Sequence, residues 1–262
     1  SNRPCDGEGA AGIGILLEQA HGAVPDDGLG VLERSGEKAH GSRADVQAYP
    51  ALRDLLGRDD LGLRPVIRVL RSIWRGSGTT EGERAIPEET AIAFTYNTAS
   101  YAVMMATPQD LEDFAVGFSL TEGVTSSLDA IESIDIVEEA MGVELRIWLK
   151  APEAAEFLGR RRKIAGPTGC GLCGVESLTE AMRPPPKVGE GRVLAPGDSM
   201  SAVDAVLPLQ VLNQETRAVH AAGFWRPERG LLALREDVGR HNALDKLAGA
   251  LAPGGLLVTA HA

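Results

Sequence analysis

Two cysteines lie close together in the stretch TGCGLCGV, which covers residues 168–175. Cys170 and Cys173 are separated by two residues, and a glycine stands on each outer side of the pair. Three chemistries use this spacing: half of a zinc site, a dithiol that cycles through a disulfide, and a thiolate that carries a sulfur atom. The rest of the chain has to distinguish among them.

The zinc interpretation lacks ligands. A structural zinc site needs four, usually supplied as two close pairs, and beyond the cysteine pair the chain has only Cys5 and five scattered histidines. A zinc nucleotide deaminase would also need an upstream H-x-E motif, whereas the upstream histidines read HGA at 21–23 and HGS at 40–42. A site that combines the pair with His220 and His241 has little support from spacing. We therefore predict no metal site.

A helix predicted at 175–182, directly behind the pair, favours thiol chemistry. Backbone N–H groups and the dipole at a helix start stabilise a thiolate. Gly169, Gly171 and Gly174 would let the loop present Cys170 to two partners in turn. A dithiol oxidoreductase, a persulfide carrier and a pair of small buried residues in a turn all remain open on these grounds.

Two further groups of side chains could take part in chemistry. The basic run RRRK at 160–163 lies just before the cysteine loop, where it could lower a thiol pKa and bind phosphates, or simply end a helix. Asp237, His241 and Asp245 follow one another at four-residue spacing, so that a carboxylate could orient the imidazole. A solvated helix end would show the same pattern.

The bulk composition limits the class of protein. The chain has 262 residues, 44% of them hydrophobic, which suffices for one large domain or two smaller ones. A net charge of −11 argues against a nucleic-acid-binding face. We expect no membrane helix because no apolar run approaches the roughly 18 residues needed. Three cysteines with one close pair suit a reducing compartment, so we expect a cytoplasmic protein.

Periodicity predicts strands alternating with helices from residue 65 onward, which indicates an α/β class with α+β elements. The predicted strands cover 65–74, 89–97, 101–107, 133–139, 142–150 and 231–237. The predicted helices cover 107–123, 151–163, 175–182, 203–217 and 237–251, with Thr107 and Asp237 as expected N-caps. Residues 1–64 show little periodicity and are predicted to be an irregular extension.

Several motifs together resemble the FdhD family, the formate dehydrogenase accessory sulfurtransferases. They are GCGLCG at 169–174, LREDVGRHNALDKL at 234–247, VHAAGF at 219–224 and EDFAVGFSLTEGV at 112–124. The resemblance covers roughly residues 65–262 as one FdhD-like domain, and residues 1–64 stay unassigned. It implies a cytidine-deaminase-like layered sheet with a smaller α+β subdomain, and a homodimer.

The resemblance also implies a function. Members of the family take sulfur from a cysteine desulfurase as a cysteine persulfide and deliver it to the molybdenum cofactor, Mo-bis molybdopterin guanine dinucleotide, before it enters formate dehydrogenase. By motif position Cys170 would carry the persulfide and Cys173 would support or resolve it. Arg161, Arg162, His241 and Asn242 are the expected cofactor-binding residues, and no catalytic metal is expected.

The family pattern continues beyond the strand expected at 254–260, so we expect the chain to be C-terminally truncated, with this strand at an uncovered sheet edge. Two alternatives to the sulfur carrier remain. One is a thiol–disulfide oxidoreductase that uses the cysteine pair, and the other is a non-enzymatic chaperone that binds the molybdenum cofactor.

Overall fold

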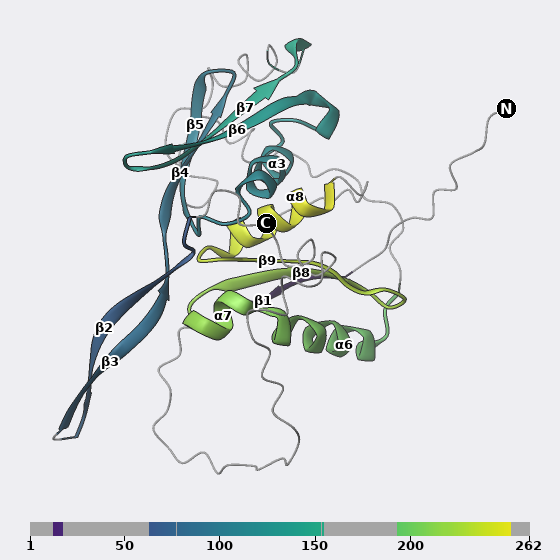
Figure 1. Cartoon of the computed structure of the whole chain (residues 1–262). Helices are drawn as coiled ribbons and strands as arrows, with labels where there is room; N and C mark the ends of the chain where they lie inside the picture. Colours follow the sequence, from purple (N-terminus) through teal and green to yellow (C-terminus); the bar gives the residue numbers. More distant parts are fainter. Residues whose placement is uncertain (1–12, 18–62, 77, 153, 155–192, 253–262) are drawn as a thin grey trace, which may run out of the picture.

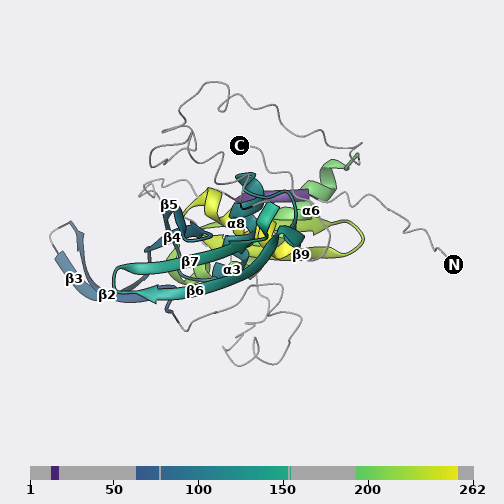
Figure 2. The same cartoon turned by 90° about the horizontal axis from the view of Figure 1, so that it is seen from above.

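The computed structural model describes residues 13–17, 63–76, 78–152, 154 and 193–252. The described strands form a four-stranded sheet, a three-stranded sheet and a separate two-stranded ribbon. Figure 1 shows the two larger sheets as layers with helices between them and further helices on the outer face of the three-stranded sheet. A two-stranded arm extends from this body in both views (Figures 1 and 2). The arrangement is a mixed α/β fold, as predicted, while the cytidine-deaminase-like layering stays a prediction.

The four-stranded sheet has the order β5-β4-β7-β6. Its strands are β4 (Thr90–Tyr96), β5 (Ala99–Ala106), β6 (Ile131–Glu139) and β7 (Gly142–Leu149), with β4 and β7 parallel and the other pairs antiparallel. Alternate residues of β7 are buried, because one face of the sheet packs on helix α3 (Leu111–Thr121). The 3-10 turn η1 (Leu128–Ala130) leads into β6.

Aromatic side chains fill the space between this sheet and α3. Phe94 of β4 stacks on Phe118 with ring centroids 4.1 Å apart and meets Phe114 edge-on at 5.0 Å. Tyr96 is fully buried beside them, and its hydroxyl group lies 2.8 Å from Ser119 Oγ. The period-two pattern of β4 and the 3.6-residue pattern of α3 thus meet in one core.

The three-stranded sheet has the order β1-β8-β9, all antiparallel. Its strands are β1 (Ile13–Leu17), β8 (His220–Arg226) and β9 (Gly230–Asp237). Helix α8 (Arg240–Leu251) covers one face, and α6 (Pro196–Val206) covers the other, followed by the 3-10 turn η2 (Leu207–Leu209) and α7 (Val211–Thr216). Pro208 interrupts the single helix predicted for 203–217, because proline lacks the N–H that the helix needs.

Helices α3 and α8 join the two sheets at a close crossing. A Cβ atom at Gly117 would collide with the carbonyl oxygen of Asp245, and one at Gly249 would collide with that of Asp113. Glycine at both positions therefore lets the two backbones approach each other closely. This contact brings the start of α3 beside the end of α8.

The projecting arm consists of β2 (Val66–Arg75) and β3 (Gly78–Pro87), paired antiparallel in one register from Val66 opposite Pro87 to Arg75 opposite Gly78. Near its base the arm touches the body, where β3 packs on α7 and Arg68 forms an ion pair with Glu215 at 3.1 Å. Figures 1 and 2 both show its far end well away from the sheets.

The six strands predicted between residues 65 and 237 are confirmed, as β2, β4, β5, β6, β7 and β9. Strands β1, β3 and β8 were not predicted, and β1 lies within the segment 1–64 that was predicted to be irregular. No helix within the described ranges is both long enough and apolar enough to cross a membrane.

Candidate functional site

The predicted site residues fall in two parts of the chain. Cys170, Cys173, Arg161 and Arg162 lie within 155–192, outside the described residues, together with the predicted helix at 175–182 and most of the predicted helix at 151–163, of which residues 151, 152 and 154 are described and helical. The predicted strand at 254–260 also lies outside the described residues. His241 and Asn242 lie in the first turn of α8.

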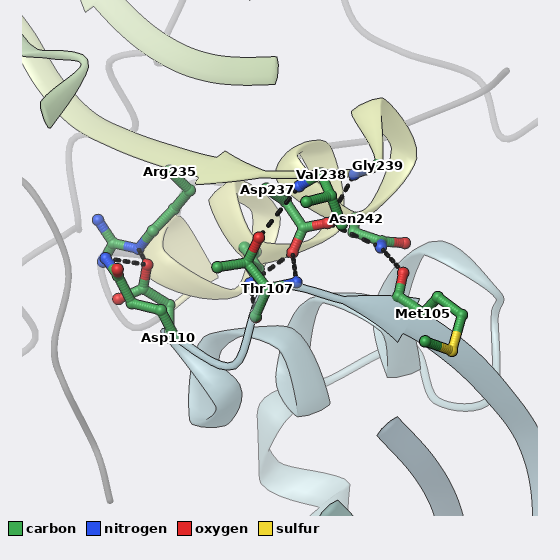
Figure 3. A network of polar contacts seen from close by, with 10 residues as sticks. Met105, Thr107, Asp110, Arg235, Asp237, Val238, Gly239 and Asn242 are labelled. Carbon is green, nitrogen blue, oxygen red and sulfur yellow. Dashed lines mark hydrogen bonds and ion pairs between the residues drawn. The ribbon is translucent and has the colours of Figure 1, made fainter. Parts of the chain in front are cut away.

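The carboxylate of Asp237 is the centre of a polar network at the end of β9 (Figure 3). Its Oδ1 accepts hydrogen bonds from the backbone N–H of Gly239 at 2.7 Å and from Asn242 Nδ2 at 2.9 Å. Its Oδ2 accepts one from the backbone N–H of Thr107 at 3.0 Å and pairs with the Lys246 ammonium group at 2.6 Å. A fully buried carboxylate needs this many partners, because burial without them would cost several kcal/mol.

Lys246 is also fully buried and has two further partners. Its ammonium group donates to the carbonyl oxygen of Thr107 at 2.8 Å and lies 5.5 Å from the centroid of the Phe114 ring. The ring face is attractive to a cation at this distance. The buried charge of Lys246 is therefore satisfied by a carboxylate, a carbonyl group and an aromatic ring.

Thr107 connects the end of β5 to the end of β9. Besides its N–H bond to Asp237, its Oγ1 accepts a hydrogen bond from the backbone N–H of Val238 at 3.1 Å. The prediction that Thr107 caps the following helix was wrong, since α3 begins at Leu111 and its cap residue is Asp110 in the left-handed conformation, with φ 56° and ψ 41°. The Thr107 hydroxyl group instead binds the backbone N–H of Val238, the residue directly after β9.

Asp237 is likewise not the N-cap of α8, which begins at Arg240 after Gly239. The carboxylate does accept the Gly239 N–H, but its other bonds hold β5 and α8. The aspartate therefore connects three elements rather than ending one helix.

Asn242 is buried and used within the chain. Its Nδ2 group donates to the Met105 carbonyl oxygen and to Asp237, both at 2.9 Å (Figure 3). A Cβ atom at Gly239 would lie 2.7 Å from this Nδ2, so a larger residue there would displace the Asn242 amide. Asn242 thus fixes the first turn of α8 against β5, and its predicted contact with the cofactor stays a prediction.

His241 is exposed in the same turn, beside the buried Asn242. The carboxylates predicted to orient it have other partners: Asp237 has those described above, and Asp245 accepts a hydrogen bond from Thr121 Oγ1 at 2.7 Å. Burial raises the pKa of Asp245 to about 7. The His241 imidazole is therefore exposed, and the buried Asn242 beside it fixes the turn to which it belongs.

Two more charged residues of β9 are buried on opposite faces of the sheet. The guanidinium group of Arg235 lies 2.7 Å from Asp113 Oδ2 of α3, so it also ties the strand to that helix. Glu236 accepts the backbone N–H groups of Leu212 and Asn213 at 2.9 and 2.8 Å, at the start of α7. Burial raises the pKa of Glu236 to about 7.

Two buried nitrogens of β8 have no hydrogen-bond partner in the described part of the chain, Nδ1 of His220 and Nε of Arg226. His220 is opposite Asp237 in the pairing of β8 with β9. Among the described residues, no group of three or more His, Cys, Asp and Glu side chains could hold a metal ion.

The polar contacts of the stretch at 234–247 are therefore mostly internal. Its buried charges hold the start of α8 in a fixed position between the two sheets, and this fixed turn presents Arg240 and His241 at the surface. Sequence reasoning missed Thr107 and Lys246 as members of the network. The available signal was the run Arg235, Glu236, Asp237 at the end of an apolar strand, where three successive charges cannot all be solvated.

Comparisons with known proteins find relatives that match the part of the chain containing this stretch. The model of the FdhD/NarQ family matches residues 87–262. A sulfur carrier protein FdhD of Agrobacterium fabrum is 52% identical over 190 residues, which cover 72% of this chain and 70% of the relative. The protein of the same name from Brucella abortus is 49% identical over 184 residues, covering 70% of this chain and 68% of the relative.

A solved structure has a similar fold. It is described as that of a formate dehydrogenase accessory protein from Desulfotalea psychrophila, and it matches with a TM-score of 0.51 at 24% identity, over 73% of this chain and 68% of its own. At this identity the match bears on the fold alone. With the family match over residues 87–262 and relatives at about half identity, the chain belongs to the FdhD/NarQ family.

Proposed function

We propose that this protein is a sulfur carrier required for formate dehydrogenase activity. The observation that carries the proposal is the family match, which includes the GCGLCG stretch at 169–174 and the signature stretch at 234–247. Relatives that match most of the chain are named sulfur carrier protein FdhD. The protein would take sulfur from a cysteine desulfurase and deliver it to the molybdenum cofactor in the cytoplasm.

Cys170 is the proposed carrier. Its thiolate attacks the terminal sulfur of a persulfide on the desulfurase, the sulfur–sulfur bond of the donor breaks, and the donor cysteine leaves as a thiolate. The sulfur then stands on Cys170 as a persulfide, with no net oxidation. A thiolate is required for this attack, and glycines on both sides would let the loop present Cys170 to a large donor.

Cys173 is the proposed resolving thiol. Its thiolate attacks Sγ of Cys170, so that the terminal sulfur leaves as sulfide and a disulfide joins the two cysteines. The dithiol supplies the two electrons that reduce this sulfur, and the molybdenum cofactor receives the sulfide as substrate. A cellular thiol then reduces the disulfide and restores the carrier.

Binding of the cofactor would use charge and a fixed turn. We propose that Arg161 and Arg162 bind its phosphates, because planar guanidinium groups match phosphate oxygens well. His241 on the surface of α8 would also contact the cofactor, and Asn242 would contribute by fixing that turn. GDP is a simple probe: Arg161→Gln with Arg162→Gln should weaken its binding and reduce the dependence of binding on salt.

Mass spectrometry tests the carrier chemistry. The protein is incubated with a cysteine desulfurase and cysteine, and its intact mass and peptides are measured before and after treatment with a thiol. We expect one added sulfur on Cys170, removed by the thiol, and absent in Cys170→Ser. Cys173→Ser should keep the added sulfur longer, because it cannot release sulfide.

The same experiment separates the alternatives. A thiol–disulfide oxidoreductase would only lose two hydrogens across the pair. A cofactor-binding chaperone would stay unmodified and still bind the guanine nucleotide. Either result would contradict the sulfur-carrier proposal.

A further inference from the structure

The β2–β3 arm has two faces of different charge. Because strand residues alternate, the residues of β2 at 67, 69, 71, 73 and 75 share one face with their partners in β3 at 86, 84, 82, 80 and 78. This face contains three arginines and neither Asp nor Glu; we call it the basic face, and its arginines are Arg71, Arg75 and Arg84. The chain as a whole has a net charge of −11, so such a face is unusual in this protein.

The arginines of the basic face are available to a partner. All three are exposed, and none forms an ion pair with a carboxylate within the described part of the chain. Arg68, on the opposite face, does have such a partner in Glu215, near the base of the arm. The free charge is therefore confined to one side of the projecting ribbon.

Two glycines lie opposite two of these arginines. Gly82 is directly across from Arg71, and Gly78 is across from Arg75. A Cβ atom at Gly82 would meet nothing within 4 Å, so the space over this strand is open. Glycine in the interior of a strand weakens it, and it commonly marks a place where another backbone approaches closely. Gly82 has no positive φ that would explain the choice of residue.

We propose that the basic face of the arm binds an extended acidic segment of a partner protein, whose backbone lies over Gly82. Residues at alternate positions of an extended segment are about 7 Å apart, which is close to the diagonal spacing of side chains on neighbouring strands such as Arg71 and Arg84. Carboxylates on one side of the segment would therefore reach these arginines. The proposal goes beyond the sulfur-carrier function and holds or fails independently of it.

An extended polypeptide fits this face better than other anionic partners. Nucleic acid would require a broader basic surface than three side chains, and the reverse face of the arm carries Glu81 and Glu83. A two-stranded ribbon is only marginally stable alone in water, so a third strand or segment laid along it would also stabilise it. The arm would thus offer the partner segment a surface that is already folded, and the bound segment would shield one face of the arm from water.

A synthetic peptide of alternating glutamate and valine, labelled with a fluorophore, is the probe. Fluorescence anisotropy with the full chain should show binding that weakens as salt rises. Combining Arg71→Gln, Arg75→Gln and Arg84→Gln should lower the affinity by roughly tenfold or more, since each charge contributes up to about 1 kcal/mol. Thermal unfolding of each variant checks that the fold is kept.

Gly82→Val is the decisive variant. Valine favours strands, so it should leave the arm intact or stabilise it, yet it fills the open space and should lower the affinity by a similar factor. Glu81→Gln with Glu83→Gln on the reverse face is the matched charge control and should bind the peptide at least as well as the original chain. A purely structural role of Gly82 would leave binding unchanged.

Other results would overturn the proposal. One is peptide binding that does not depend on the arginines, or no binding at low salt. Another is peptide binding that is lost in Leu70→Ser with Trp74→Ser, whose side chains are 85% and 75% exposed on the reverse face. Arginine-dependent binding to vesicles of anionic lipid without peptide binding would assign the face to a membrane instead. Self-association that disappears with the arginines would assign it to a second copy of the chain.

Discussion

The ammonium group of Lys246 lies 2.6 Å from Oδ2 of Asp237, and neither side chain has any exposed surface. This pair stands where β5, β9 and α8 meet. Because each charge is removed from water, each depends on the other and on the surrounding hydrogen bonds.

Removing one charge of this pair should destabilise the protein strongly. Lys246→Met leaves the Asp237 carboxylate buried without its cation, which is expected to cost about 3–5 kcal/mol of the free energy of unfolding. Urea denaturation followed by circular dichroism measures this. The double variant Asp237→Asn with Lys246→Met should lose less free energy of unfolding than Lys246→Met alone, because no charge of the pair remains buried. Lys150→Met, on the surface, serves as the control.

The stability of the fold should fall as the pH rises from 5 to 8. Burial raises the pKa of Asp245 and that of Glu236 to about 7. Between the ordinary pKa of a carboxyl group and pH 7 the folded state keeps protons that the unfolded chain has released, so raising the pH favours unfolding.

The measurement compares Asp245→Asn with the original chain. Between pH 5 and pH 8 the free energy of unfolding of the original chain should fall by on the order of 1–3 kcal/mol more than that of the variant, because the asparagine has no proton to release. Glu236→Gln should act in the same direction, whereas Glu132→Gln on exposed β6 should not. If the stability of the original chain and of all three variants depended on pH in the same way, Asp245 and Glu236 would not be the source of the pH dependence.

Any side chain at position 117 should destabilise the fold, because α3 and α8 cross too closely there to accommodate it. Gly117→Ala forces a Cβ atom onto the backbone of Asp245, and it should destabilise the fold by about 1–3 kcal/mol even though alanine favours helices. Gly197→Ala in α6, where a Cβ atom meets nothing within 4 Å, is the matched control and should be neutral or stabilising. The difference in melting temperature between the two variants tests the close approach.

Neighbouring residues of α8 should separate stability from function. Asn242→Ala removes two hydrogen bonds of a buried amide and should lower the free energy of unfolding by about 1–3 kcal/mol. His241→Ala changes an exposed side chain and should alter it by less than about 0.5 kcal/mol, while weakening GDP binding if His241 contacts the cofactor. Unchanged GDP binding in His241→Ala would remove that residue from the site.

The sequence predicted the elements with clear periodicity. Strand β4 and helix α3 each bury one face against the other, and this leaves a pattern that can be read directly. Strand β3 was missed because it belongs to an exposed ribbon, where GTTEGER shows no alternation. Strand β8 was missed because it is buried on both faces, so its sequence HAAGFWR shows no alternation of apolar and polar residues.

The candidate site was predicted only in outline. The motifs at 169–174 and 234–247 identified the family, and the spacing of Asp237 and His241 suggested a functional pair. Their spacing along a helix could not reveal that Asp237 lies before the helix and bonds to Thr107. Such a contact depends on how two distant parts of the chain are brought together, which local patterns do not encode.

The hydrogen bond from the Thr107 N–H to Asp237 joins residues 130 positions apart. Strand pairing of β4 with β5, and of β8 with β9, requires only short loops, whereas closing this long loop carries a larger entropic cost. The bond should therefore form late, after both sheets exist, and break only when they separate. Exchange of the Thr107 and Val238 amide hydrogens with deuterated solvent should then proceed through global unfolding, so that these two amides report the rate and free energy at which the whole molecule opens.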